Sequence, residues 1–282
     1  MSFSQLQSRI DALGSPIVVG LDPTEALIPP HLLLSHSFNA DTVAQFCCEI
    51  IDAVSDIVPA VKPQSAFFER LGIDGVRALY YISEYAHSRG LYVILDAKRG
   101  DIGSTAQAYA DAYLGAYAPF DALTVNGYLG SDGILPFFTT ARTYGKGVFV
   151  LVKTSNPSSG ELQDLDVGGR TVYEAVADII SDISGGDTLG AVVGATYPET
   201  LESLRRRLGD AMFLIPGYGA QGGGAGDVAR GFDTSGRSAI VNSSRAILGA
   251  WQSSNADSRD FAATARLETL RMRDELRNAL GL

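Results

Sequence analysis

Cysteine, histidine and tryptophan are scarce in this chain of 282 residues, which contains two, three and one of them. Cys47 and Cys48 are adjacent, and adjacent cysteines rarely form a disulfide with each other. Since there is also no C-x-x-C motif, a disulfide scaffold and a zinc ribbon are excluded, and we expect a reducing, cytoplasmic compartment. His31, His36 and His87 are scattered without metal-ligand spacing, so no metal site is expected from them.

The chain also lacks basic runs and long apolar runs. Its net charge is −10, which argues against a nucleic-acid partner. No apolar run approaches the roughly 20 residues that a membrane-spanning helix needs. The N-terminal segment 1–13 is polar and amphipathic, unlike a signal peptide. We therefore expect neither a nucleic acid nor a membrane as partner, and an anionic substrate would have to be bound by local positive groups.

Eight short segments rich in β-branched residues recur along the chain. They are almost continuously apolar instead of alternating with polar residues, which is typical of parallel strands covered on both faces. The eight segments are 16–22, 59–64, 91–98, 121–126, 147–154, 190–196, 212–219 and 238–244. Amphipathic segments lie between them, including 41–57, 75–90, 170–183 and 198–209, and a final helix is expected at about 259–280.

Eight strand–helix units predict an α/β fold of the (β/α)8 TIM-barrel type, as one domain over residues 1–282. A doubly wound sheet is the alternative, but no strand is followed by a G-x-G-x-x-G fingerprint. No linker or low-complexity segment marks a domain boundary. Two loops rich in Gly and Ser, 155–169 and 219–236, follow the fifth and seventh strands, on the face where barrel enzymes build their sites.

Polar residues gather where the predicted strands end. Asp96 and Lys98 would share one side of the third strand, so both side chains can point into the barrel mouth, whereas Arg99 would point the other way and is left out of the catalytic set. Asp101 follows a glycine, and the S-T-A-Q segment reads as a capping box that would start the next helix near Ser104. The other polar residues at strand ends are Asp22, Lys62, Asn126, Lys153, Thr154, Asn242, Ser243, Ser244 and Arg245.

A lone Asp or Lys at a strand end is more often a cap or a surface ion pair. The four residues Lys62, Asp96, Lys98 and Asp101 carry no net charge together, however, so mutual pairing would make their burial tolerable. A core built for stability alone would use apolar side chains. We therefore interpret this set as functional.

The loops after the seventh and eighth strands suit a phosphate group, as they do in many barrels. The first is rich in glycine and contains Gln221, and the second places Ser244 and Arg245 at a helix start. Arg245 can supply a bidentate charged contact, beside free backbone amides. In the alternative interpretation the loop is only flexible and Arg245 caps an acidic neighbour.

Five motifs together resemble the orotidine 5′-phosphate decarboxylase family, and most of all its longer bacterial branch. They are VGLDP (19–23), VKPQ (61–64), DAKRGDIGST (96–105), PGYGAQGG (216–223) and NSSRAI (242–247). The Asp-x-Lys-x-x-Asp pattern is typical of the enclosing superfamily. The KRGDIGST continuation narrows the resemblance from that superfamily to the decarboxylases. The resemblance implies conversion of orotidine 5′-phosphate to uridine 5′-phosphate and CO2, the last step of de novo pyrimidine synthesis, by a homodimer without metal or organic cofactor.

The resemblance also assigns roles to matching positions. Lys98 would protonate C6 of the pyrimidine, Asp96 would face the substrate carboxylate, and Lys62 would complete the charge network and touch the ribose. Asp101 and Thr105 would enter the site from the partner subunit, close to the ribose hydroxyls. The expected substrate contacts are Asp22 with the ribose, Thr154 or Ser155 with the pyrimidine, Gln221 and Arg245 with the phosphate, and Asn126 and Ser244 beside them. Segment 219–231 is the expected lid.

Three other activities remain open. An Mg²⁺-dependent sugar-phosphate enzyme of the same superfamily, such as a hexulose-phosphate synthase or a keto-gulonate-phosphate decarboxylase, would be inhibited by chelators. A Schiff-base aldolase would use Lys98 or Lys153 as its nucleophile and would be trapped by borohydride. A ligand-binding barrel would bind phosphate compounds without turnover.

Overall fold

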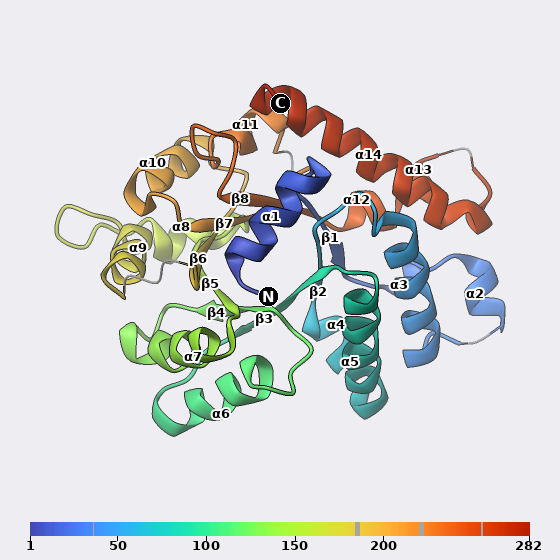
Figure 1. Ribbon diagram of the computed structural model, residues 1–282, viewed down its shortest axis with the longest axis horizontal. Helices are drawn as coiled ribbons and strands as arrows, with labels where there is room; N and C mark the ends of the chain where they lie inside the picture. The colour runs from blue at the N-terminus through green and yellow to red at the C-terminus, as the bar shows by residue number, and fades with distance from the viewer. Residues whose placement is uncertain (36, 184–186, 220–222, 255) are drawn as a thin grey trace.

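Eight parallel strands close into a barrel in the computed structural model, which describes residues 1–35, 37–183, 187–219, 223–254 and 256–282 (Figure 1). Each strand pairs with the next along the chain, and the eighth returns to pair with the first. The predicted (β/α)8 barrel is therefore confirmed. The strands are β1 (Ile17–Leu21), β2 (Ala60–Pro63), β3 (Tyr92–Arg99), β4 (Ala122–Asn126), β5 (Gly147–Lys153), β6 (Leu189–Val193), β7 (Met212–Pro216) and β8 (Ala239–Ser243).

Helices surround the barrel, because the segments between the strands are amphipathic and turn their apolar sides toward the sheet (Figure 1). Those from the first half of the chain are α1 (Phe3–Leu13), α2 (Pro30–Ser35), α3 (Ala40–Val54), α4 (Ser65–Glu69), α5 (Gly72–Ser88), α6 (Gly103–Leu114) and α7 (Ser131–Tyr144). Those from the second half are α8 (Gly160–Gln163), α9 (Val172–Ile183), α10 (Pro198–Leu208), α11 (Ala225–Ala229), α12 (Arg245–Leu248), α13 (Ala250–Ser253) and α14 (Phe261–Leu280). Short 3₁₀ turns lie at Glu25–Leu27, Pro157–Ser159 and Ser258–Asp260.

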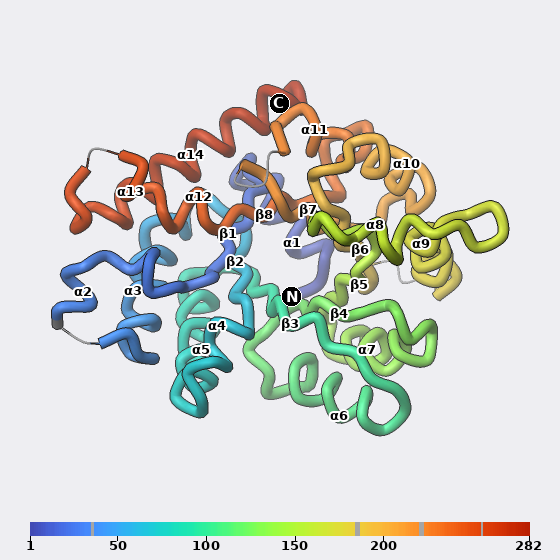
Figure 2. Tube along the Cα trace, turned by 180° about the vertical axis from the view of Figure 1, so that it is seen from behind, coloured from blue at the N-terminus to red at the C-terminus, as the bar shows by residue number. Residues whose placement is uncertain are grey.

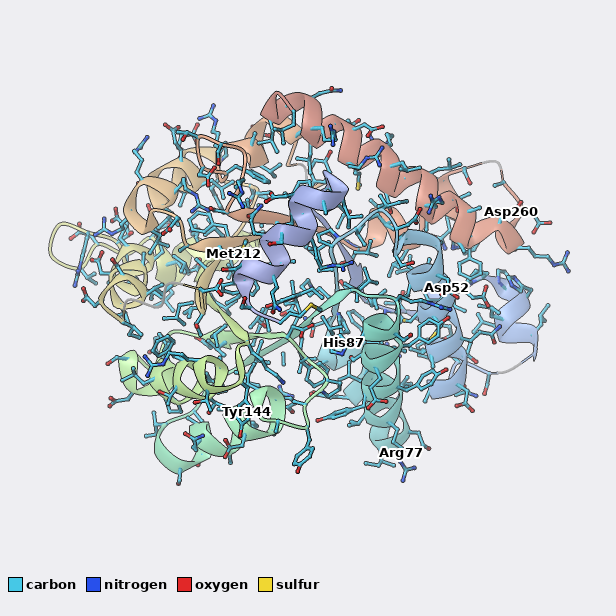
Figure 3. All side chains as sticks on the ribbon, in the orientation of Figure 1. Asp52, Arg77, His87, Tyr144, Met212 and Asp260 are labelled. Atoms are coloured by element: carbon cyan, nitrogen blue, oxygen red, sulfur yellow. The ribbon has the colours of Figure 1, made fainter. Side chains whose placement is uncertain are left out.

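The barrel interior is apolar and is closed at its N-terminal end by α1, which crosses the barrel in Figure 1. The ring of Phe3 in α1 lies 4.7 Å from that of Phe149 in β5, centroid to centroid. Met212, labelled beside α1 in Figure 3, belongs to the same buried cluster. Since side chains fill this end, only the opposite end of the barrel is open to a ligand.

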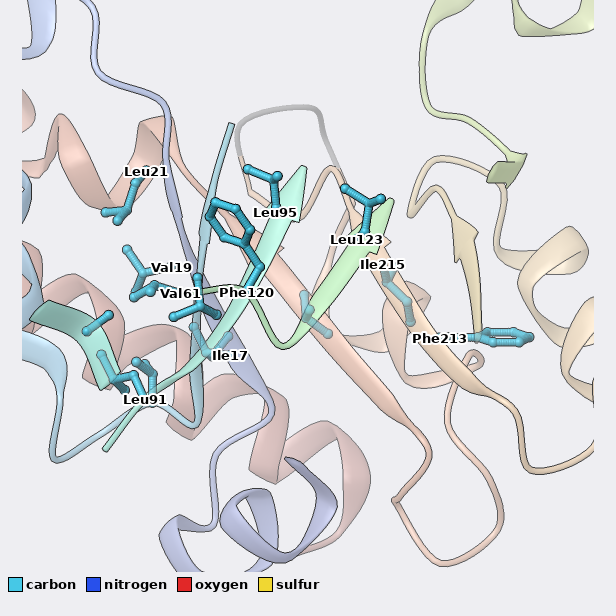
Figure 4. Close-up of a cluster of buried hydrophobic side chains, with 14 of the residues drawn as sticks. Ile17, Val19, Leu21, Val61, Leu91, Leu95, Phe120, Leu123, Phe213 and Ile215 are labelled. Carbon is cyan, nitrogen blue, oxygen red and sulfur yellow. The ribbon is translucent and has the colours of Figure 1, made fainter. Parts of the chain in front are cut away.

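A second apolar cluster lies between the strands and the surrounding helices. Figure 4 shows part of it, where Val19, Val61 and Leu95 from three neighbouring strands point outward from the barrel. The near-continuous apolar runs of the sequence follow from these two clusters, because each strand has one face in the barrel interior and the other against helices.

Arg205 of α10 is a buried cation that ties the β6–β8 side of the barrel together. Its guanidinium donates hydrogen bonds to four backbone carbonyl oxygens, at distances of 2.6 to 2.8 Å, namely those of Gly209, Ala211, Gly231 and Ser238. Burial lowers the pKa of Arg205 to about 10.

The predicted capping box at Ser104 is wrong. Helix α6 begins at Gly103, its N-cap is Ile102, and no side chain caps it. Gly103 has a φ of +56°, so the chain turns into the helix before Ser104, which already lies inside the first turn. Over the described part of the chain, no helix combines the length and the apolar character needed to cross a membrane.

Candidate active site

A cavity of about 700 Å³ opens at the C-terminal ends of the strands, on the side shown in Figure 2. All eight strands, or the residues directly following them, contribute to its lining. Carboxyl ends of parallel strands converge there, which brings side chains distant in sequence together. The predicted site residues that line the cavity are Asp22, Lys62, Asp96, Lys98, Asn126, Thr154, Ser155, Ser244 and Arg245.

Three of these residues form a continuous chain of charges. Lys62 Nζ donates to Asp96 Oδ2 at 2.8 Å, and Lys98 Nζ donates to Asp96 Oδ1 at 2.6 Å. The side chains of Lys62 and Asp96 are only 4% and 11% exposed, whereas that of Lys98 is 46% exposed. Lys98 therefore presents its ammonium group to the cavity, and the buried pair behind it holds that group in place.

The charges in this chain stabilise one another. Burial by itself would raise the pKa of Asp96, but the two ammonium groups outweigh it, so that the pKa of this carboxyl lies well below its usual value. Burial would likewise lower the pKa of Lys62, but the carboxylates of Asp96 and Asp22 outweigh it and the pKa is raised. Asp96 and Lys62 are thus ionised at neutral pH.

Strand β3 does not keep a simple alternation where it carries these charges. Leu95 pairs with Leu123 and Arg99 with Val125, so that residues 96–98 stand opposite the single residue Thr124. Lys98 has a φ of +48°, which is unusual for a residue other than glycine. Asp96 and Lys98 reach the same cavity, as predicted, but they do so through a bulge in the strand.

Thr124 holds this bulge from the neighbouring strand β4. Its Oγ1 accepts a hydrogen bond from the backbone N–H of Lys98 at 3.0 Å and donates one to Asp96 Oδ1 at 2.9 Å. The side chain is buried and lines the cavity. One hydroxyl therefore fixes both the backbone of Lys98 and the carboxylate of Asp96.

Arg99 points away from the cavity, as the sequence predicts. Its guanidinium pairs with Glu69 and lies over the ring of Tyr113. Lys153 also turns outward, because the register of β5 against β6 shifts between Leu151 and Lys153. Lys153 Nζ contacts Asp164 Oδ1 at 2.6 Å and does not line the cavity.

Three side-chain polar atoms of residues that line the cavity are buried without a hydrogen-bond partner, namely Asp22 Oδ1, Asn242 Oδ1 and Ser243 Oγ. A buried polar atom without a partner is costly, so these atoms are suited to accept hydrogen bonds from a bound ligand. Gly20 leaves room for the side chains of Ser244 and Asn242, because a Cβ at this position would lie 1.8 Å from Ser244 Oγ and 3.0 Å from Asn242 Oδ1.

The expected phosphate site is described in part. Arg245 starts α12 and is exposed to the cavity, as predicted. No carboxylate in the described ranges pairs with it, which contradicts the alternative of an acidic neighbour. Gln221 lies outside the described residues, and so does part of the expected lid 219–231.

The loop after β5 is bound closely to the end of its strand. Gln163 Oε1 accepts a hydrogen bond from Thr154 N at 3.0 Å, and Gln163 Nε2 donates one to Thr154 Oγ1 at 2.8 Å. Thr154 Oγ1 in turn donates to Asn156 Oδ1 at 2.6 Å. Both candidates for the pyrimidine contact, Thr154 and Ser155, line the cavity.

Asp101 and Thr105 do not join the other predicted residues within the single chain. Neither lines the cavity, Asp101 Oδ1 accepts a hydrogen bond from the backbone N–H of Ile102, and Thr105 is exposed. Several large apolar side chains are exposed in this part of the chain. One is next to Asp101 in sequence, and the others lie on α7 or in the loop before it. These side chains are Ile102, Tyr128, Leu129 and Leu135.

Comparison with known proteins identifies the family. The model of the Orotidine 5′-phosphate decarboxylase / HUMPS family matches residues 15–258. The chain belongs to this family. An orotidine 5′-phosphate decarboxylase of Rhodopirellula baltica is 47% identical over 300 residues, which covers 98% of this chain and 99% of that protein. One of Clostridium tetani is 38% identical over 289 residues, covering 100% and 99%. Leishmania donovani OMP decarboxylase has a structure similar to this one, with a TM-score of 0.78 and 35% identity, covering 97% of this chain and 100% of that one.

Membership of the orotidine 5′-phosphate decarboxylase / HUMPS family bears on the rival activities. The relatives above are named for orotidine 5′-phosphate decarboxylation and give no support to the Mg²⁺-dependent sugar-phosphate alternative. A Schiff-base nucleophile at Lys153 is contradicted by its outward orientation. Among the described residues, no three His, Cys, Asp or Glu side chains form a cluster that could hold a metal ion.

Several residues of the cavity were not predicted from the sequence of this family member. Thr124 could have been found, because it lies two residues before Asn126 and so shares its side of β4. Gln64 lies two residues after Lys62, directly after β2, and also lines the cavity, so it could have been found in the same way. Gln163 ends the short helix α8, in a segment whose sequence has no periodicity, so no pattern indicated its contact with Thr154.

Proposed function

We propose that the chain converts orotidine 5′-phosphate to uridine 5′-phosphate and CO2, the final step of de novo pyrimidine nucleotide synthesis. The relatives above carry the name of this activity and match the chain over its whole length. The observation that carries the proposal is the chain of charges Lys62–Asp96–Lys98, whose outermost ammonium group faces the cavity.

The chemistry of decarboxylation explains why a lysine is needed there. Loss of CO2 leaves a carbanion at C6 of the pyrimidine, and no adjacent carbonyl delocalises that charge as an enolate. The Lys98 ammonium stabilises the developing carbanion and then donates its proton to C6. Asp96 faces the substrate carboxylate, and it holds the Lys98 ammonium in position through the 2.6 Å contact. Lys62 keeps Asp96 ionised and contacts the ribose.

The rest of the cavity binds the remainder of the nucleotide. Arg245 and Ser244 hold the phosphate, together with Gln221 from the loop after β7. Asp22 receives a ribose hydroxyl on its unpartnered oxygen. Thr154, Ser155 and Asn126 contact the pyrimidine side of the ligand. Binding energy from the distant phosphate lowers the barrier at C6 by driving closure of segment 219–231 over the ring.

Asp101 and Thr105 act in the site of a partner subunit, in a homodimer. Support comes from their position outside the cavity of their own chain and from the exposed apolar side chains near them, of which Ile102 lies directly beside Asp101. Apolar side chains exposed together mark a surface that another protein covers. A twofold dimer then supplies the same two residues to both sites.

Each protomer works as one (β/α)8 domain over residues 1–282, in the cytoplasm. The barrel closes only with β1 and β8 together, and α14 near the C-terminus packs against α3 near the N-terminus. Cys47 and Cys48 are free thiols, in agreement with a reducing compartment.

The activity is tested by the absorbance change of orotidine 5′-phosphate on addition of purified, EDTA-treated protein. We expect turnover by the wild type and a loss of many orders of magnitude in Lys98→Ala, which still binds uridine 5′-phosphate. Lys98→Arg keeps the charge beside Asp96 but is a poor proton donor, so it is equally inactive. Arg206→Ala, at an exposed cation on α10, serves as the control with full activity. Chelator-sensitive turnover of a sugar phosphate, or Lys98→Ala activity within tenfold of wild type, would contradict the proposal.

The dimeric site is tested by mixing two inactive variants. Lys98→Ala and Asp101→Ala subunits form hybrid dimers with one intact site, so about a quarter of the wild-type activity returns after random exchange. The matched control mixes Lys98→Ala with Asp96→Ala. Each of these changes disables the site of its own subunit, so both sites of a hybrid dimer are inactive and no activity returns. If exchange is confirmed and the first mixture stays inactive, the shared site is wrong.

A further inference from the structure

Gln163 occupies both polar groups that Thr154 presents at the end of β5. The side-chain carbonyl of Gln163 accepts from the backbone N–H of Thr154, and its amide N–H donates to the hydroxyl oxygen. The hydroxyl hydrogen of Thr154 is directed to Asn156. Thr154 therefore has no unused donor for a pyrimidine while Gln163 is in this position.

The contact that Gln163 makes has the same pattern as the edge of a pyrimidine. A carboxamide presents a carbonyl oxygen beside an N–H, and the pyrimidine ring of orotidine and uridine 5′-phosphates presents the C4 carbonyl beside N3–H. Either group satisfies one N–H donor and one hydroxyl acceptor on Thr154. Gln163 lines the same cavity as Lys98, so its carboxamide and the pyrimidine of a bound nucleotide would compete for the same place on Thr154.

We propose that Gln163 is an internal surrogate for the pyrimidine edge, which the substrate displaces from Thr154 when it binds. The proposal rests on the proposed function, because it takes the base to be a pyrimidine with a carbonyl beside an N–H. Gln163 thereby lowers the affinity for the nucleotide by the cost of breaking its own two hydrogen bonds. It also favours a base that replaces both bonds over one that replaces neither.

The surroundings of Gln163 indicate that only its side chain moves when the substrate binds, while helix α8 keeps its position. The next residue, Asp164, pairs at 2.6 Å with Lys153, whose side chain is almost completely buried between Tyr173 and Tyr197. This ion pair anchors the end of α8 to β5. A glutamine side chain can leave Thr154 by rotating about its own bonds, which requires no movement of this anchor.

Two variants and two ligands test the proposal by equilibrium titration. Gln163→Ala removes the surrogate, and Gln163→Met removes its hydrogen bonds while keeping the side-chain length. We expect both variants to bind uridine 5′-phosphate about tenfold more tightly than the wild type. The affinity for ribose 5-phosphate, which has no base, stays unchanged. Glu161→Ala is the matched control, since Glu161 is exposed on the same short helix and does not line the cavity.

Weaker or unchanged binding of uridine 5′-phosphate in these variants would overturn the proposal, and so would an equal shift for both ligands. A crystal structure of the wild type with uridine 5′-phosphate provides a second measurement that needs no variant. It should show the C4 carbonyl and N3–H on Thr154 with Gln163 turned away, and Gln163 still bound to Thr154 would refute displacement. Wild-type protein that fails to decarboxylate orotidine 5′-phosphate but shows the predicted affinities would contradict only the proposed function.

Discussion

Replacing Thr124 by valine removes the hydroxyl that connects β4 to the bulge of β3, while the shape of the side chain is nearly unchanged. The wild-type hydroxyl donates to Asp96 Oδ1 at 2.9 Å and accepts from Lys98 N at 3.0 Å. In Thr124→Val, Asp96 keeps its two lysine partners but loses its neutral donor. The backbone N–H of Lys98 loses its acceptor in a region that is partly buried.

The expected magnitude follows from these two bonds. A hydrogen bond to a charged group contributes about 1.5–3 kcal/mol, and leaving a buried donor unpaired costs about 1–3 kcal/mol. Because both penalties fall on the bulge that carries Lys98 at a φ of +48°, we expect Thr124→Val to lower the free energy of unfolding by about 3 kcal/mol. The Lys98 ammonium is then no longer held at C6, and a misplacement of this kind lowers kcat by about 30-fold to 100-fold.

Steady-state kinetics with orotidine 5′-phosphate and urea unfolding measure both effects. The loss should appear in kcat with little change in KM, because Thr124 positions the reacting lysine and does not itself bind the phosphate. Thr124→Ser keeps the hydroxyl and should recover most of the activity. If Thr124 contributed only to stability, the two variants would have the same kcat at saturating substrate as long as both were folded. If Thr124→Val turns over within threefold of wild type, or Thr124→Ser is as impaired as Thr124→Val, this reasoning is wrong.

Three further substitutions test other parts of the structure. Arg205→Met leaves four buried carbonyl oxygens without their donor, and urea unfolding should show a loss of about 4 kcal/mol; a loss below about 1 kcal/mol would contradict the role of Arg205. Burial would raise the pKa of Asp121, but hydrogen bonds from His87 and the chain's amino group outweigh it, and the pKa is lowered. The Asp121 carboxylate therefore stabilises the folded protein above about pH 4, and this contribution is lost as the pH falls further. Asp121→Asn should therefore destabilise the protein at pH 7, with a difference from wild type that shrinks below pH 4; a difference independent of pH would refute this. Gly20→Ala places a Cβ against Ser244, and the KM for orotidine 5′-phosphate should rise about tenfold, whereas an unchanged KM would show that the site tolerates the methyl group.

The eight strands could be predicted because each is a nearly continuous apolar run, and this property belongs to the sequence itself. The same holds for the charges that follow them, and for Arg99, which points away from the cavity as expected. The start of α6 near Ser104 could be predicted, but its cap could not, because the helix already begins at Gly103 and Ser104 lies inside its first turn. A serine side chain caps a helix only if the serine itself has the extended backbone of the N-cap residue, which Ile102 has here, and the sequence does not determine which residue takes that place.

The partner of each charge depends on registers that no local pattern reveals. Strict alternation after Leu151 would turn Lys153 into the barrel, and a one-residue shift between β5 and β6 turns it out toward Asp164. Each of the four lysines of the chain has a hydrogen-bond partner elsewhere in the fold or on its own strand. Lys62 and Lys98 donate to Asp96, Lys153 donates to Asp164, and Lys146 donates to the carbonyl oxygens of Gly115 and Ala118. Lys98 differs from the other three because its side chain, which lines the cavity, remains about half exposed.

The sequence by itself thus determined the barrel, the end of it that holds the site, and the residue types that meet there. These follow from hydrophobic periodicity and from the order of the strands, which are properties of a linear chain. Only the tertiary structure decided that Thr124 fixes the bulge and that Gln163 covers Thr154. These contacts join residues on different strands and loops, and their geometry depends on the register, the bulges and the packing of the whole barrel.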